Sequence, residues 1–330
     1  MSGLFVHGIP AAVPAEEAAL CRSRLLRAVD SLREEAGVDE LDIRITKALP
    51  AAPRATERDE PSAAERASRY GAGEPLWGIE RLVAPETLLD ELAAVVEMAE
   101  LEPLIFDTWG MRSVEPFPRS VLNFHGPPGT GKTMAAHAVA SSLNRRIIAA
   151  SYADIESKYH GDGPKNVEAL FFAAQRDNAV LFIDEADSLL SKRLTNVTQG
   201  SEQAINSMRS QLLICLERHR GVVIFATNLI ENYDSAFETR VRNIRFDLPD
   251  ETARAAIWRA HLPAQLPLAD DVDVAFLAAK SDGFCGREIR QAVLDAVIRA
   301  ARRGCVVCQE DFAGAVERVA MNSRHERPRT

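Results

Sequence analysis

The chain has 330 residues, 46% of them hydrophobic and 26% charged, which is the composition of an ordinary soluble globular protein with two or three domains. Its formal net charge of −9 argues against a general nucleic-acid-binding protein, and no run of 18 apolar residues could span a membrane. The sequence does not open with a basic segment followed by an apolar stretch, so we expect a cytoplasmic protein without a signal peptide.

Residues 1–49 are expected to form a small α/β unit. The stretch 15–35 carries an apolar stripe at helical spacing, and 42–46 alternates like a strand. Residues 50–75 are rich in Pro, Ala, Glu and Arg with few large apolar side chains, which is typical of a linker. The N-terminal unit carries no chemical motif, and partner recognition is the role we expect for it.

From Trp77 onward the pattern is globular again. A helical segment over 88–101 precedes a short apolar run at 121–125, and an Ala-rich helical stretch follows at 134–143. Further apolar runs with the character of buried strands alternate with helical stretches. They lie at 146–150, 179–183, 222–227 and 244–248. This alternation predicts a parallel sheet covered by helices on both faces.

Beyond residue 250 only helical periodicity remains. The expected helices cover 253–261, 274–279, 286–303 and 309–320. We therefore expect a large α/β domain over 76–249, a small all-α domain over 250–323, and a frayed tail over 324–330.

The five cysteines are scattered, and only Cys305 and Cys308 form a C-x-x-C pair. A zinc site would need a second pair of ligands at suitable spacing, and the sequence offers none. A redox pair is expected near the start of a helix in a thioredoxin-like unit, whereas this pair follows a long helical stretch. We expect reduced thiols near a short connector.

The motif with the most chemical content is G-x-x-x-x-G-K-T, between the first apolar strand and the Ala-rich helix. Its glycines let backbone N–H groups point at a phosphate, and the following helix adds its positive dipole end. Lys132 is expected to reach the β- and γ-phosphates, and Thr133 to ligate Mg²⁺. A turn without a ligand is the alternative, which eight matching positions and both flanks disfavour. The expected nucleotide contacts are Gly126, Pro127, Pro128, Gly129, Thr130, Gly131, Lys132, Thr133 and Met134.

Two carboxylates, Asp184 and Glu185, directly follow the apolar run at 179–183. The carboxyl end of a strand is the ligand end of an α/β sheet. Asp184 is placed to hold Mg²⁺, and Glu185 to polarise an attacking water. Asn228 ends the next strand candidate and can orient that water. The alternatives are a strand that merely ends in surface acids, and a capping or turn asparagine.

Arg240 and Arg242 lie between Asn228 and the last expected strand. A guanidinium at the γ-phosphate would stabilise transition-state charge, an effect of roughly 10³–10⁵ in rate. By itself an arginine pair is usually a solvated face. The sequence has no N-K-x-D motif, which specifies guanine, so ATP is favoured over GTP.

With these elements in order, residues 77–320 resemble the AAA clade of the AAA+ ATPases. The resemblance identifies 126–133 as Walker A, 181–185 as Walker B and Asn228 as sensor 1. It implies a P-loop NTPase α/β domain followed by a small helical lid, with ATP and Mg²⁺ as ligands. It also implies a ring, usually a hexamer, in which each site receives an arginine from the next subunit.

The second region of homology in this family matches residues 234–249. The match makes Arg240 the first arginine-finger candidate and Arg242 the second, although this segment is compressed relative to the family. Segment 282–288 resembles the sensor 2 region and makes Arg287 a candidate γ-phosphate contact. Many AAA-clade members lack an arginine there, and a helix-start arginine is the alternative.

Residues Lys158, Tyr159, His160 and Gly161 resemble pore loop 1 of the spastin and katanin group, with His160 in place of the usual aliphatic residue. Tyr159 would be the aromatic side chain that grips a polypeptide, and a packed tyrosine beside a turn is the alternative. Segment 198–202 lies where pore loop 2 would be.

The expected function is that of an ATP-hydrolysing remodelling motor, a homo-hexamer that pulls a protein client through its pore loops. The alternative is an ATP-gated assembly or regulatory subunit through which no chain passes. The sequence has neither H-E-x-x-H nor G-x-S-x-G, so any proteolysis would belong to a separate chain. Neither a membrane nor nucleic acid is an expected partner.

Overall fold

The computed structural model describes residues 23–24, 27–28, 31, 62–115, 120–156, 162–191, 200–228, 235–238 and 240–326. The chain divides into two units, Met1–Glu60 and Pro61–Thr330. In the first unit the five described residues are helical and lie inside the helix expected over 15–35, whereas the strand expected over 42–46 lies outside the described residues. A search of the described residues found no helix with the length and apolar character needed to cross a membrane.

A five-stranded sheet forms the centre of the second unit, and all its neighbouring strands are parallel. The strand order is β2-β3-β4-β1-β5. The strands are β1 (Ser120–His125), β2 (Ile147–Ser151), β3 (Val180–Asp184), β4 (Val222–Thr227) and β5 (Arg242–Arg245). The first four lie within one residue of the predicted ranges, which alternate with helices as expected. The predicted α/β fold class is therefore confirmed.

The last strand differs from the expected range 244–248. It pairs with β1 from Leu122 to His125, and Phe246 adds one more hydrogen bond, from its N–H to the carbonyl of His125 (2.8 Å). Since β1 ends at His125, residues after Phe246 have no strand beside them to pair with. The ladder therefore starts and stops earlier than the apolar residues indicate.

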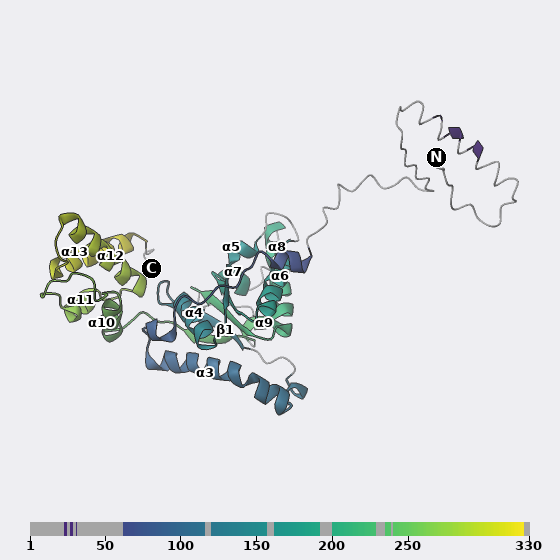
Figure 1. Ribbon diagram of the computed structural model, residues 1–330, viewed down its shortest axis with the longest axis horizontal. Helices are drawn as coiled ribbons and strands as arrows, with labels where there is room; N and C mark the ends of the chain where they lie inside the picture. Colours follow the sequence, from purple (N-terminus) through teal and green to yellow (C-terminus); the bar gives the residue numbers. More distant parts are fainter. Residues whose placement is uncertain are drawn as a thin grey trace. The chain divides into compact units, whose positions relative to one another are not determined.

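Helices cover both faces of this sheet (Figure 1). On one face α3 (Glu86–Glu102) and α4 (Lys132–Ser142) pack in one cluster with strand residues such as Phe182. On the other face α6 (Asp162–Arg176) and α8 (Gly200–Arg218) pack with Leu181 and Ile183. Successive strand side chains point to opposite faces, so one apolar strand supplies both clusters. The short elements are α5 (Tyr152–Ile155), α7 (Asp187–Leu190), α9 (Ser235–Glu238), η1 (Ile79–Arg81), η2 (Pro103–Thr108) and η3 (Met111–Ser113).

The C-terminal helices have a hydrophobic core of their own, in which the Trp258 and Phe312 rings meet edge to face at 5.8 Å. These helices are α10 (Glu251–Ala260), α11 (Val274–Lys280), α12 (Gly286–Arg303) and α13 (Gln309–Glu326). Helix α13 includes residues 324–326, which we expected in a frayed tail. The first proline after the start of α13 is Pro328, so no proline interrupts the helix before its last described residue.

Residues 62–75, expected to be part of a linker, belong to the fold instead. Helix α2 (Ala63–Ala67) starts with a capping box between Ser62 and Glu65. Ala67 is fully buried in the cluster that contains α6, and Gly73 exchanges two backbone hydrogen bonds with Ile147 on β2. The composition resembles a linker because small and charged residues, rather than large apolar ones, make these contacts.

Candidate functional site

The turn between β1 and α4 surrounds the ammonium group of Lys132. Its Nζ donates to the carbonyl oxygens of Gly126 (2.6 Å) and Pro127 (2.9 Å), and to Oδ1 of Asn228 (3.0 Å). Burial lowers the pKa of Lys132, while the nearby carboxylates of Asp184 and Asp187 act in the opposite direction. The loop thus holds a partly desolvated cation at the N-terminus of a helix, where an anion is favoured.

Gly126 is required by the packing of this turn. Its φ is 140°, and a Cβ atom added to it would lie 2.0 Å from the carbonyl oxygen of Phe246. No side chain fits there without moving the backbone that continues from β5. The glycine therefore lets the turn between β1 and α4 pass close to the end of the neighbouring strand.

The strand order brings the acidic pair, Asp184 and Glu185, to the same end of the sheet as Lys132. Because β4 lies between β1 and β3, Asn228 at the end of β4 stands between the turn after β1 and Asp184 at the end of β3. Oδ2 of Asp184 lies 3.5 Å from the hydroxyl of Thr133. A hydroxyl and one carboxylate are a donor set that suits Mg²⁺, which takes its remaining ligands from phosphates and water.

Glu185 adopts a left-handed backbone conformation with φ of 53°, which is uncommon for a residue other than glycine. Its N–H donates to Oδ1 of Asp184 (2.9 Å), and the next N–H, of Ala186, donates to the carbonyl of Ala226 (2.9 Å). These bonds hold the chain in a sharp turn where β3 ends. A conformation that costs about 1–3 kcal/mol is thus kept at the residue predicted to polarise water.

Asp187 was not among the predicted site residues, yet it positions one of them. Its Oδ1 accepts a hydrogen bond from the hydroxyl of Thr227 and another from the backbone N–H of Asn228 (3.1 Å). Both donors stand at the end of β4. The only sequence signal for this role is its position three residues after Asp184, where α7 begins.

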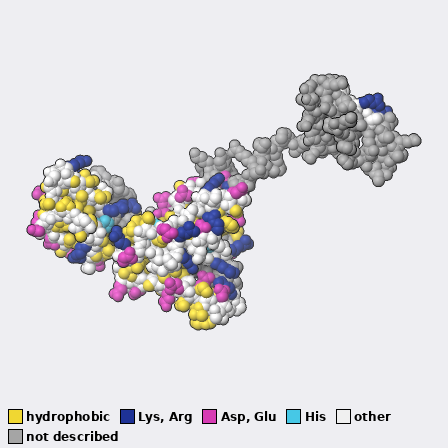
Figure 2. Space-filling model, viewed as in Figure 1, with side chains coloured by type: hydrophobic (Ala, Val, Ile, Leu, Met, Phe, Trp, Pro, Cys, Tyr) yellow, Lys and Arg dark blue, Asp and Glu magenta, His cyan; other side chains and the backbone are white. Residues whose placement is uncertain are grey.

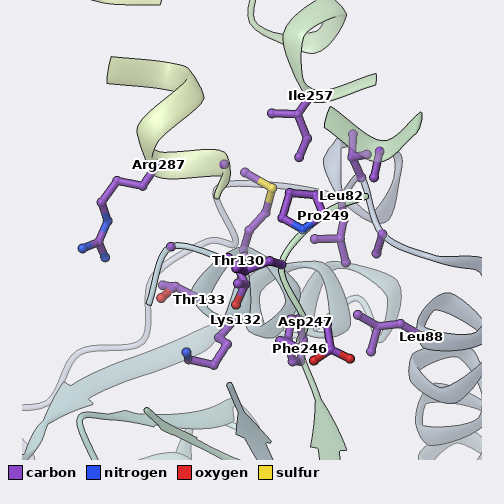
Figure 3. A pocket seen from close by; sticks show the side chains of 18 of the residues that line it. Leu82, Leu88, Thr130, Lys132, Thr133, Phe246, Asp247, Pro249, Ile257 and Arg287 are labelled. Carbon is purple, nitrogen blue, oxygen red and sulfur yellow. The ribbon is translucent and has the colours of Figure 1, made fainter. Parts of the chain in front are cut away.

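A pocket of about 650 Å³ opens at this end of the sheet, a size that suits a small-molecule ligand. In Figure 3 the side chains of Lys132, Thr133 and Arg287 lie toward one side of the view. The apolar side chains lie toward the other side, among them Leu82, Pro249 and Ile257. One end can therefore hold phosphates and the other a flat organic ring.

The start of α12 closes the pocket against the turn between β1 and α4. The N–H of Arg287 donates to the carbonyl of Gly129 (3.4 Å). A Cβ added to Gly129, whose φ is 80°, would lie 2.6 Å from Sγ of Cys285. Burial raises the pKa of the Cys285 thiol. The helical domain thus contacts the turn directly, and Gly129 leaves the room for that contact.

The predicted nucleotide contacts fall into two groups. The turn from Pro128 to Met134 lines the pocket, as does Arg287. Gly126 and Pro127 lie behind Lys132 and accept its hydrogen bonds. Arg245, Asp247, His261 and Arg290 also line the pocket and were not predicted. Arg290 follows Arg287 by one helical turn, whereas Arg245 and Asp247 reach the site only because β5 lies beside β1.

Arg240 and Arg242 do not line this pocket. Nη2 of Arg240 pairs with Glu217 (2.8 Å), its Nη1 donates to the carbonyl of Ala236 (2.7 Å), and Arg242 is exposed on β5. Of the predicted pore residues, Lys158, Tyr159, His160 and Gly161 lie outside the described residues, as do residues 198 and 199. Residues 200–202 form the first turn of α8.

Residues 122–248 match the model of the ATPase family associated with various cellular activities (AAA). Protein CdcH of Halobacterium salinarum is 34% identical over 285 residues, which cover 77% of this chain and 38% of that protein. The proteasome-activating nucleotidase of Methanopyrus kandleri is 34% identical over 245 residues, covering 72% and 55%. The katanin p60 ATPase-containing subunit A1 of Strongylocentrotus purpuratus is 38% identical over 192 residues, covering 54% and 36%. The chain thus spans about half or less of the length of these relatives.

Proposed function

Since the chain belongs to the AAA family of ATPases, we propose that it hydrolyses ATP and uses the energy to remodel or unfold a protein client. One observation carries the proposal: three strands deliver Lys132, Asn228 and the Asp184–Glu185 pair to one pocket. The names of two relatives, a proteasome-activating nucleotidase and a katanin ATPase subunit, are consistent with it.

Each of these side chains has a part in the proposed reaction. Lys132 supplies a fixed positive charge to the phosphates, and Asn228 holds both that ammonium and the attacking water. Glu185 accepts a proton from the water, in the position that its left-handed backbone sets. Thr133 and Asp184 would hold Mg²⁺, which when bound neutralises charge on the phosphate oxygens.

We expect the working form to be a ring, as a homo-hexamer. Arg240 and Arg242 lie away from the pocket of their own chain, which supports a role for one of them at the site of a neighbouring subunit. Figure 2 shows hydrophobic side chains over the lobe formed by α10–α13, and Phe276, Leu294 and Ile298 there are about half exposed. Exposed apolar side chains on this lobe support a contact with a neighbouring subunit.

The first test replaces Glu185 with Gln. The variant should bind ATP, hydrolyse it hardly at all, and shift the chain toward the ring in sedimentation velocity with ATP present. Glu168→Gln, an exposed glutamate on α6, is the matched control and should behave as wild type. Normal turnover in Glu185→Gln would remove the role proposed for Glu185.

The second test concerns the client. The Glu185→Gln variant should retain the client in a pull-down from the native host, and the captured protein then serves as substrate. Tyr159→Ala should keep ATP turnover and lose work on that client. A Tyr159→Ala variant that unfolds the client as well as wild type would overturn the pulling mechanism. Wild-type turnover close to zero with the captured client would indicate an ATP-gated assembly subunit instead.

A further inference from the structure

Residues 62–73 contact described residues on both sides of segment 157–161. On its N-terminal side, the hydroxyl of Tyr70 donates to the carbonyl of Asp154 (3.3 Å). On its C-terminal side, Nη2 of Arg66 lies 3.0 Å from Oδ1 of Asp162, the first residue of α6. Residues near the start of the second unit therefore contact both ends of one internal segment.

Asn166 joins these two ends. Its Nδ2 donates to the carbonyl of Ile155 (3.0 Å), and its Oδ1 accepts from Nη1 of Arg66 (3.4 Å). Arg66 and Asn166 are only 5% and 7% exposed. Hydrogen bonds at this degree of burial matter more than surface ones, because a partner left alone keeps its desolvation cost.

The same residues are fixed to the body of the unit at two further points. Gly73 exchanges two backbone hydrogen bonds with Ile147, both 2.9 Å, at the first residue of β2. Ala67 is fully buried in the cluster that contains α6, and Tyr70 packs against that cluster. Strand β2 runs directly into α5, so residues 62–73 follow one side of the β2–α5 unit from its start to its end.

We infer that residues 62–73 are a strap that holds α5 and the start of α6, the elements on either side of segment 157–161, in register, with Arg66 as its positioning residue. Segment 157–161 contains Lys158 and Tyr159, so any effect of the strap on client handling rests on the proposed function. The strap itself does not depend on it.

The test uses the full chain and compares Arg66→Gln with Arg69→Gln. Arg69 is exposed on the same strap and is the matched control. Arg66→Gln should raise amide hydrogen exchange about tenfold or more in peptides covering 152–156 and 162–168, since a charge-assisted bond is lost there. Exchange in β3 and β4, and the unstimulated kcat and KM for ATP, should stay at wild-type values.

Asp162→Asn supplies a milder variant and closes a double-mutant cycle. If Arg66 acts through Asp162, the double variant should raise exchange in these peptides no more than Arg66→Gln alone. Additive effects would overturn the role of this ion pair. Equal exchange in Arg66→Gln and Arg69→Gln would overturn the strap, and so would a uniform rise over β1, β3 and β4.

The two proposals fail separately. With the captured client, Arg66→Gln should lower the client unfolded per ATP hydrolysed while ATP turnover persists. If Tyr159→Ala unfolds the client normally, the pulling mechanism is lost but the exchange result for the strap stands. If Arg66→Gln does not change hydrogen exchange in the peptides covering 152–156 and 162–168, the strap is overturned. That holds whatever the result for Tyr159→Ala.

Discussion

Nζ of Lys132 donates to Oδ1 of Asn228 across 3.0 Å, which joins the phosphate-binding turn to the end of β4. The two residues are 96 positions apart and meet because β4 lies directly beside β1. Asn228 is in turn held by the carboxylate of Asp187 through its backbone N–H. The position of the Lys132 ammonium therefore depends on a short hydrogen-bonded chain that starts on α7.

Asn228→Ala should lower kcat for ATP about 10²-fold, because one oriented polar group at the reacting centre is lost. ATP binding should weaken much less, since the turn and the apolar end of the pocket remain. Single-turnover hydrolysis and titration with a fluorescent ATP analogue separate the two effects. Gln175→Ala, an exposed amide on α6, is the control. An equal loss in binding and in kcat would show that Asn228 serves mainly to hold Lys132.

Asp187→Asn should cause part of the loss in kcat expected for Asn228→Ala, although Asp187 acts only through its contact with Asn228. The amide oxygen is a weaker acceptor than a carboxylate for the Thr227 hydroxyl and the Asn228 N–H. A double variant with Asn228→Ala should be no slower than Asn228→Ala alone in single-turnover hydrolysis. Multiplicative effects of the two changes would assign Asp187 a separate role.

Gly126→Ala should destabilise the second unit, because the new Cβ meets the Phe246 carbonyl at 2.0 Å. We expect the free energy of unfolding to fall by about 2 kcal/mol or more in urea titration, with ATP binding lost. A Cβ on Gly71 has no neighbour within 4 Å, so Gly71→Ala should leave both quantities close to wild type. Wild-type ATP binding by Gly126→Ala would show that the turn can move away from β5.

His219 should make stability fall in mild acid. Burial lowers its pKa from 6.5 to about 4, and its ring packs edge to face on Phe171 at 5.2 Å. Below pH 6.5 the unfolded chain binds a proton that the folded chain does not, so stability is lost as the pH falls toward about 4. At pH 5 this amounts to about 2 kcal/mol.

His219→Gln removes this titration. The free energy of unfolding, measured by urea titration at pH 7 and pH 5, should therefore fall less in the variant than in wild type. Carboxylates titrate in both proteins and cancel in the comparison. Parallel pH profiles would contradict the low pKa of His219.

The helices and strands of the second unit could be predicted because their apolar periodicity is strong and the turn residues are distinctive. Where prediction was wrong, a partner distant in the sequence decides the structure. Strand β5 follows the length of β1 rather than its own apolar residues. Arg66 is buried only because Asp162 and Asn166, about a hundred positions later, lie opposite it. No local composition records such a pairing.

The turn after β1, the Asp184–Glu185 pair and Asn228 could be located from their motifs alone, since each motif is short and its spacing to a strand end is local. The insertion of β4 between β1 and β3, which brings Asn228 to Lys132, was set by the folded arrangement of the strands. The tertiary fold also determined which residues close the pocket and that residues 62–73 are packed. Strand order and buried ion pairs depend on contacts between distant residues, and the free energy of those contacts exists only once the chain has folded.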